Sequence, residues 1–225
     1  MAKAAFIAES PRRAPAPRVR AAGCRVWDAD GEARIDFDMG GGSVVLGHAQ
    51  LVVEAAVTDP PSDAEEAAAE ALLSMLPAAQ AVRFTAAESQ ALPAAIAAAR
   101  KVTGRQRVLA CALPTGPFGE PDDLAAVVVD PLGVGACELR AARELADASG
   151  ALLIFDEGVS AFRTHETGAE GLSGVSPDMS VHGAALANGR PLGAVAGRKP
   201  LIAALDDADL PAPLPASLAA AAATL

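Results

Sequence analysis

The chain has 225 residues, of which 28 are acidic and 18 basic, so its formal net charge is −10. Nucleic acids and anionic membrane surfaces are bound mainly through Lys and Arg, so this balance disfavours both as partners. No segment approaches the roughly 20 apolar residues that span a bilayer, and the N-terminus is too weakly apolar for a signal peptide. We therefore expect a cytoplasmic protein.

Hydrophobic residues make up 52% of the chain, but aromatic residues make up only 3% and there is no Tyr. Aromatic platforms that could stack on a planar cofactor are therefore scarce. The cysteines Cys24, Cys111 and Cys137 are odd in number and widely spaced, which indicates neither a disulfide framework nor a zinc site. We expect three buried thiols. The three histidines are too far apart in the sequence to suggest a metal site, so we predict no metal.

The first third of the chain predicts small elements joined by loops. A Pro- and Arg-rich stretch, residues 9–22, predicts an extended arm, and we assign residues 1–22 to it. Two apolar runs around Asp30 and Gly31 predict a β-hairpin. The glycine-rich segment 39–48 predicts a loop. Ser62 and Glu65 have the spacing of a capping box that opens an Ala-rich helix.

From residue 81 onward, strand and helix patterns alternate, which favours an α/β fold with a mostly parallel, doubly wound sheet. Gly104 and Gly150 are placed to end two of the helices. The predicted strands are 81–85, 106–110, 124–131, 151–157 and 191–197, and the predicted helices are 88–104, 136–149 and 215–225. We assign residues 23–225 to one domain.

Several sequence blocks are informative together because of their order along the chain. They are Val26–Gly31 with Ile35–Phe37, Leu46–His48, Ala81–Phe84, Ala99–Gly104, Ala126–Pro131, Gly150–Glu157 with Phe162 and Arg163, and Gly174–Asp178. These blocks resemble the class III, fold-type I aminotransferases that use pyridoxal phosphate (PLP), in particular glutamate-1-semialdehyde aminomutases. The resemblance implies the large PLP domain of that family, without its C-terminal small domain.

The same alignment implies that the residues that hold the cofactor have been replaced. Ala184 stands at the position of the lysine that attaches PLP, and Glu88 stands in the phosphate-binding turn, where a carboxylate repels phosphate. In the segment that supplies the family's aromatic ring, Phe118 is the only aromatic residue. We therefore expect no PLP attachment and no cofactor.

Three residues remain as candidates for acid/base catalysis. Asp156 matches the acid that pairs with the cofactor's ring nitrogen, and Glu157 follows it. His182 lies two residues before Ala184 and titrates near neutrality. The sequence leaves two interpretations open: these side chains line the old cavity at the carboxyl edge of the sheet, or they form structural hydrogen bonds.

Arg163, Ser43 and Ser89 are the candidates for substrate binding. Arg163 could hold a carboxylate through two hydrogen bonds, or it could pair with Glu157 or Glu166 and fix its own loop. The glycines before Ser43 would let the backbone approach a ligand closely.

Two functions remain open. The first is a PLP-independent acid/base enzyme of the isomerase, cyclase or dehydratase type that acts on a small molecule in a biosynthetic pathway. The second is a non-catalytic pseudoenzyme that binds a ligand or pairs with a full-length aminotransferase. We expect a homodimer, with a heterodimer as the alternative.

Overall fold

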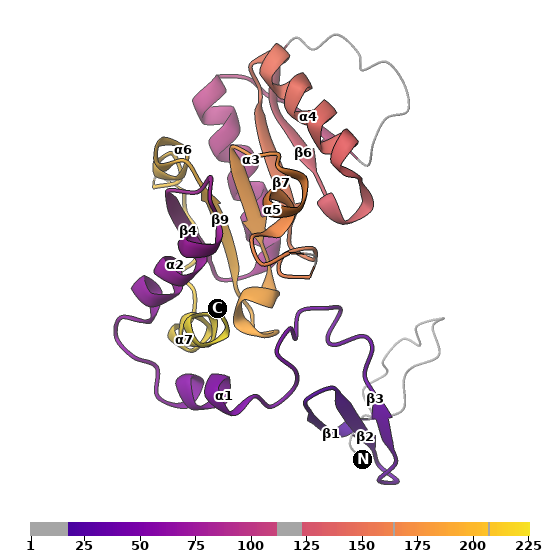
Figure 1. Cartoon of the computed structure of the whole chain (residues 1–225). Helices are drawn as coiled ribbons and strands as arrows, with labels where there is room; N and C mark the ends of the chain where they lie inside the picture. The colour runs from indigo at the N-terminus through magenta and orange to yellow at the C-terminus, as the bar shows by residue number, and fades with distance from the viewer. Residues whose placement is uncertain (1–17, 112–122, 164, 207) are drawn as a thin grey trace, which may run out of the picture.

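The structure is a computed structural model that describes residues 18–111, 123–163, 165–206 and 208–225. Its centre is a six-stranded sheet in the order β4-β9-β8-β7-β6-β5 (Figure 1). The strands are β4 (Ala81–Thr85), β5 (Arg107–Cys111), β6 (Leu124–Val129), β7 (Leu152–Glu157), β8 (Met179–His182) and β9 (Gly193–Gly197). The predicted α/β class with a mostly parallel sheet is confirmed.

One strand, β9, runs against the other five. It is antiparallel to both of its neighbours, whereas β5 to β8 pair in parallel. Thr85 pairs with Gly193, the neighbouring residue Ala194 pairs with His182, and His182 pairs with Glu157. The carboxyl ends of β4, β7 and β8 therefore meet at one edge of the sheet, which we call the carboxyl edge.

Helices cover both faces of this sheet. The helix α3 (Glu88–Thr103) packs on one face beside α6 (Lys199–Ala203), and its inner side consists of buried alanines, which let the helix approach the strands closely. The opposite face carries α4 (Ala136–Ser149) and α5 (Gly168–Ser173) over β6 and β7. Beside them, α1 (Leu51–Thr58), α2 (Ala64–Met75) and α7 (Pro215–Thr224) form a third cluster with β4 and β9.

Helix ends agree with the sequence where glycine ends the helix. Gly104 and Gly150 follow α3 and α4 with φ of +69° and +65°, the left-handed conformation that glycine adopts without strain. The capping box predicted at Ser62 is wrong. The helix α2 begins after Asp63, and no side chain caps it. Two short 3₁₀ helices, η1 (Pro131–Gly133) and η2 (Ala184–Ala187), are the remaining helical elements of the described residues.

A three-stranded antiparallel sheet precedes this core. It consists of β1 (Arg18–Ala22), β2 (Arg25–Asp28) and β3 (Ala33–Ile35), and Figure 1 shows it set apart from the six-stranded sheet. The predicted hairpin is confirmed as β2 and β3. Residues 18–22 of the predicted arm form β1 and pair with β2, so the predicted boundary between arm and domain at residue 22 falls between two paired strands. Residues 1–17 of the predicted arm lie outside the described part.

Hydrogen bonds tie the loop after β3 to the rest of the chain. Asp36 is buried, and its carboxylate bonds the His48 ring (Oδ2 to Nε2, 2.8 Å), a contact that lowers the pKa of Asp36. The amide of Asn188 donates to the Gly47 carbonyl and accepts from the Leu46 N–H, both at 3.0 Å. These bonds hold the loop beside the carboxyl edge.

The expectation of buried thiols is wrong for two of the cysteines. Cys24 and Cys137 are exposed, because Cys24 lies in the turn between β1 and β2 and Cys137 lies in the first turn of α4. The side chain of Cys111 lies outside the described part.

Candidate functional site

The three predicted acid/base residues lie at the carboxyl edge but on different faces of the sheet. Side chains alternate along a strand. Ile154 packs under α3, whereas Phe155 belongs to the core under α4. Asp156 therefore shares the α3 face, and Glu157 shares the α4 face with its register partner His182. The structure brings Glu157 and His182 together and places Asp156 on the other side.

Glu157 and His182 are both buried. Glu157 is 1% exposed, its Oε2 accepts the Ala169 N–H at 2.8 Å, and burial raises its pKa to about 7. The His182 ring is stacked with Phe162, with ring centroids 6.1 Å apart, and its Nε2 lies 2.9 Å from the Ser180 Oγ. Burial lowers the pKa of His182 to about 4, so the ring is neutral at pH 7. Its Nδ1 has no hydrogen-bond partner among the described residues.

On the α3 face, Asp156 lies beside Glu88, the first residue of α3. A Cβ placed on Gly158 would lie 2.7 Å from Glu88 Oε1 and 3.3 Å from Asp156 Oδ1, and one on Gly183 would lie 2.5 Å from Glu88 Oε2. The same Oε2 accepts the N–H of Ala184 at 3.3 Å. The Glu88 carboxylate thus fills a space that two glycines leave open. Burial raises the pKa of Asp156, against a lowering hydrogen bond from the Gly158 N–H.

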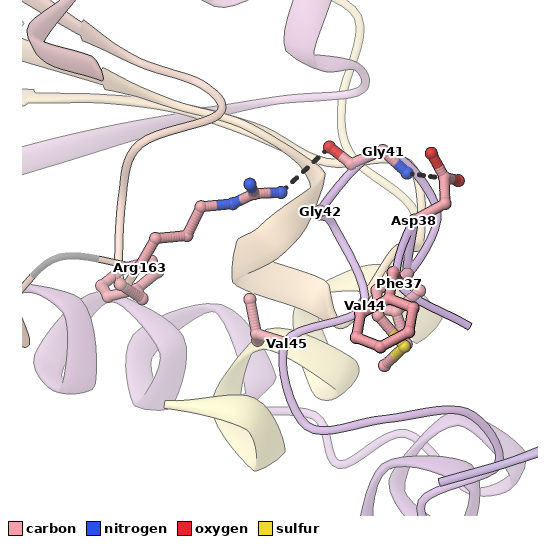
Figure 2. A pocket seen from close by; sticks show the side chains of 9 residues that line it. Phe37, Asp38, Gly41, Gly42, Val44, Val45 and Arg163 are labelled. Carbon is pink, nitrogen blue, oxygen red and sulfur yellow. Dashed lines mark hydrogen bonds between the residues drawn. The ribbon is translucent and has the colours of Figure 1, made fainter. Parts of the chain in front are cut away.

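A hollow of about 620 Å³ lies between the loop after β3 and the loop after β7. Figure 2 shows the Arg163 side chain extending towards Gly41 and Gly42, with Phe37 and Val44 beyond them. One Nη2 N–H of Arg163 donates to the Gly41 carbonyl at 3.1 Å. We call this hollow the Arg163 pocket; it is lined by Phe37, Asp38, Met39, Gly41, Gly42, Val44, Val45, Phe162 and Arg163.

Two residues of the Arg163 pocket have backbone conformations that are unusual for their type. Met39 has φ of +46° and Phe162 has φ of +62°. A residue other than glycine pays about 1–2 kcal/mol for a left-handed conformation, and such residues concentrate at functional sites. Phe162 also joins this pocket to the carboxyl edge, since its ring is stacked with His182.

The predicted substrate-binding residues are dispersed. Arg163 lines the pocket, and no carboxylate of the described residues lies within ion-pair distance of its guanidinium, so the alternative pairing with Glu157 or Glu166 is not formed there. Ser43 Oγ donates to the Gly40 carbonyl at 2.7 Å and does not line the pocket. Ser89 is exposed in the first turn of α3.

Sequence analysis missed the apolar wall of the pocket. Phe37, Val44 and Phe162 come from two loops that are far apart in the chain, so no local spacing joins them. The glycines at 40–42 were the one usable signal, because they mark a loop whose backbone other groups can approach.

No group of three or more His, Cys, Asp or Glu side chains in the described part of the chain is placed to hold a metal ion. Among the same residues, no helix is both long enough and apolar enough to cross a bilayer.

The otherwise parallel sheet with one antiparallel strand and helices on both faces matches the large domain of the fold-type I aminotransferases. A transaminase solved with PLP bound is 30% identical and superposes with a TM-score of 0.82 over 96% of this chain and 67% of its own. An omega-transaminase from Sphaerobacter thermophilus is 27% identical, with a TM-score of 0.80 over 96% of this chain and 66% of its own.

Curated relatives found by sequence indicate the same family. Glutamate-1-semialdehyde 2,1-aminomutase from Bordetella avium is 30% identical over an alignment that covers 81% of this chain and 58% of the relative. Its counterpart 2 from Exiguobacterium sibiricum is 29% identical over 81% of this chain and 56% of the relative. The chain thus spans rather more than half the length of these relatives. No family model matches it. The chain belongs to the class III, fold-type I aminotransferase-like proteins.

The described residues do not fit PLP, the cofactor this family implies. Ala184, which the resemblance aligns with the cofactor lysine, carries no amine. The Glu88 carboxylate lies in the glycine-lined space at the start of α3, where a phosphate would meet its charge. Lys101 and Lys199, the described lysines, lie at the opposite edge, because α3 ends there and β9 runs away from the carboxyl edge.

Proposed function

We propose that the chain is a PLP-independent, ligand-binding member of the aminotransferase fold, and that its ligand is a small molecule with a carboxylate group. The ligand would occupy the Arg163 pocket. This is the pseudoenzyme alternative of the sequence analysis.

One observation carries the proposal: a guanidinium lines the hollow of about 620 Å³ and has no carboxylate partner among the described residues. Arg presents five N–H donors in a planar fork that matches a carboxylate, and only one donor is engaged, by the Gly41 carbonyl. The curated relatives are named for glutamate-1-semialdehyde, a compound that also carries a carboxylate.

Binding of benzoate, with benzamide as its neutral isostere, tests the proposal by isothermal titration calorimetry. We expect benzoate to bind in the millimolar range or tighter and benzamide to bind at least about tenfold more weakly, because charge-assisted hydrogen bonds contribute about 1.5–3 kcal/mol. Arg163→Gln should lower benzoate affinity by a similar factor.

Arg25→Gln is the matched control, since it removes the same charge from an exposed position on β2. Its affinity for benzoate should stay within about twofold of the wild type, because bulk ions screen a distant surface charge. Equal binding of benzoate and benzamide would contradict the proposal. Retention of PLP at micromolar concentration, followed by absorbance, would contradict its PLP-independent part.

The other function, an acid/base enzyme, is favoured by the carboxyl groups at the sheet edge. Their pKa values are raised, that of Glu157 to about 7, which suits proton transfer near neutral pH. Phenylpyruvate is a suitable probe, because its keto–enol interconversion moves one proton between oxygen and carbon and is followed by ultraviolet absorbance.

Acceleration of this interconversion that is lost in both Glu157→Gln and His182→Gln would support the enzyme. Unchanged rates in these two variants would remove both residues from the mechanism. Because both side chains are at least half-buried, each variant also needs an unfolding curve that matches the wild type.

A further inference from the structure

Gly42 lies where the Arg163 guanidinium comes to rest. A Cβ placed on Gly42 would lie 0.7 Å from Nη2, 1.9 Å from Cζ and 2.7 Å from Nε of Arg163. Figure 2 shows the guanidinium reaching this part of the loop. Any side chain at position 42 therefore takes the space that the guanidinium now occupies.

The contact fixes which edge of the guanidinium remains available. The edge formed by Nε and Nη2 lies over Gly42, and Nη2 donates to the neighbouring Gly41 carbonyl. The Nη1 amino group has no hydrogen-bond partner among the described residues. The glycine loop thus holds one side of the fork and leaves the other side for a ligand.

The other walls of the pocket indicate what is attached to the carboxylate. Phe37, Val44 and Phe162 form an apolar wall, and the Phe37 side chain is 92% exposed, so an apolar ligand body would cover it. Asp38 also lines the pocket, with Oδ2 accepting the Gly41 N–H at 3.0 Å. Its negative charge disfavours a second carboxylate on the ligand.

We propose that Gly42 is a positioning residue. Because Gly42 has no side chain, the Arg163 guanidinium has room to lie against the loop, where it can bind a monocarboxylate with an apolar body. The inference rests on the proposed function, because it assigns the ligand class to the same pocket.

Gly42→Ala tests the inference, and Gly31→Ala is its matched control. Gly42 has φ of +87° and Gly31 has φ of +86°, so alanine is strained equally at both positions, but a Cβ on Gly31 meets nothing within 4 Å. Gly31 lies in the hairpin turn, away from the Arg163 pocket. In Gly42→Ala, the flexible end of Arg163 gives way.

Benzoate binding should fall by roughly tenfold or more in Gly42→Ala, as it does when a charged hydrogen-bond partner is lost, and should stay within about twofold in Gly31→Ala. In an Arg163→Ala background, Gly42→Ala should cause no further loss of benzoate affinity. Such a cycle isolates the coupling between the two residues.

Thermal unfolding separates a loss of affinity from a loss of fold. Because the flexible end of Arg163 gives way, Gly42→Ala should lower the unfolding temperature by about as much as Gly31→Ala does, so weaker benzoate binding in Gly42→Ala alone reports the displaced guanidinium. The double variant of Gly42→Ala with Arg163→Ala also keeps the test open if Gly42→Ala alone folds poorly.

The outcomes separate the two proposals. Absence of benzoate binding in the wild type overturns the proposed function and, with it, the assigned ligand class. If the wild type binds and Arg163→Ala does not, but Gly42→Ala behaves like Gly31→Ala, Gly42 is not a positioning residue and the proposed function stands.

Discussion

Glu157 and His182 are register partners on adjacent strands, on the same face of the sheet, and their pKa values are shifted in opposite directions. Burial raises the pKa of Glu157 from 4.5 to about 7, with a smaller contribution from Glu170, and lowers that of His182 from 6.5 to about 4. Both shifts favour the neutral form. At pH 7 the His182 ring is therefore neutral, and the Glu157 carboxyl is about half protonated.

The pair predicts a distinctive dependence of stability on pH. The folded chain keeps the Glu157 proton up to about pH 7, while the unfolded chain loses it near 4.5, so this contribution to stability falls as pH rises between these values. The contribution of His182 to stability has the opposite sign: it rises with pH between about pH 4 and 6.5, because the unfolded chain binds the proton more tightly there. We expect these two contributions to the free energy of unfolding to oppose each other across the shared range.

Glu157→Gln removes the contribution of Glu157 and leaves the pH dependence that His182 gives to stability. Its free energy of unfolding should rise with pH from about 4 to 6.5, by an amount of the order of a few kcal/mol at about 1.4 kcal/mol per pKa unit. Urea denaturation at half-unit pH steps measures it. Parallel curves for the wild type and the variant would show that Glu157 titrates normally.

Glu88 gives a second prediction at this scale. Because its carboxylate lies in the glycine-lined space beside Ala184, Ala184→Lys alone should not create PLP binding. Adding Glu88→Ser removes the repelling charge and leaves the helix N-terminus of α3 open to an anion.

We therefore expect the double variant to retain PLP through gel filtration, measured by its absorbance, at least about tenfold more strongly than Ala184→Lys does. Equal retention would show that Glu88 is not the obstacle. Glu88→Gln with Ala184→Lys is the control, because it keeps the bulk of the side chain and removes only the charge.

Among the elements, the loop after β3 depends on one residue at the end of η2. Asn188 has φ of +49°, and its amide makes two hydrogen bonds to that loop. Asn188→Ala should destabilise the fold by about 2–4 kcal/mol through lost hydrogen bonds and backbone strain. Asn188→Gly loses the same bonds without the strain and should cost about 1–2 kcal/mol less.

Urea denaturation compares these two variants, and benzoate titration shows whether the Arg163 pocket loosens with its loop. We expect both variants to bind benzoate more weakly than the wild type does. Wild-type affinity in both would show that the pocket keeps its shape without the Asn188 contacts.

The elements also show how far the sequence predicts this fold. α3 and α4 could be bounded from the sequence, because Gly104 and Gly150 end them through their own backbone preference. The start of α2 could not, since Ser62 and Glu65 have the right spacing but the chain enters the helix one residue later. Strand order depends on distant partners and has no local signal.

The candidate site could be predicted only in part. Asp156 and Glu157 are consecutive in a strand, so the alternation of side chains already places them on opposite faces, and that part was available from sequence. The contact between Gly42 and Arg163 joins residues 121 positions apart in sequence through space that a missing Cβ leaves open. No local pattern reports such a contact.

On the scale of the whole molecule, apolar side chains are exposed at the start of α1 and in the loop before it. Leu51 is 84% exposed, and Leu46 and Val52 are exposed as well. Clusters of exposed apolar residues mark interaction surfaces, and a second copy of the same chain is the commonest partner. We propose that this surface, formed by segment 46–52, is where the expected homodimer associates.

Light scattering after gel filtration measures the association. We expect a mass of twice the chain's 22.5 kDa, and a mass near that of one chain for Leu51→Glu, because a buried unpaired charge costs several kcal/mol. Leu172→Glu, at a 64% exposed position on α5, is the control and should keep the wild-type mass.

A dimer that survives Leu51→Glu would contradict this surface, and a mixed complex with a lysine-containing aminotransferase would favour the heterodimer.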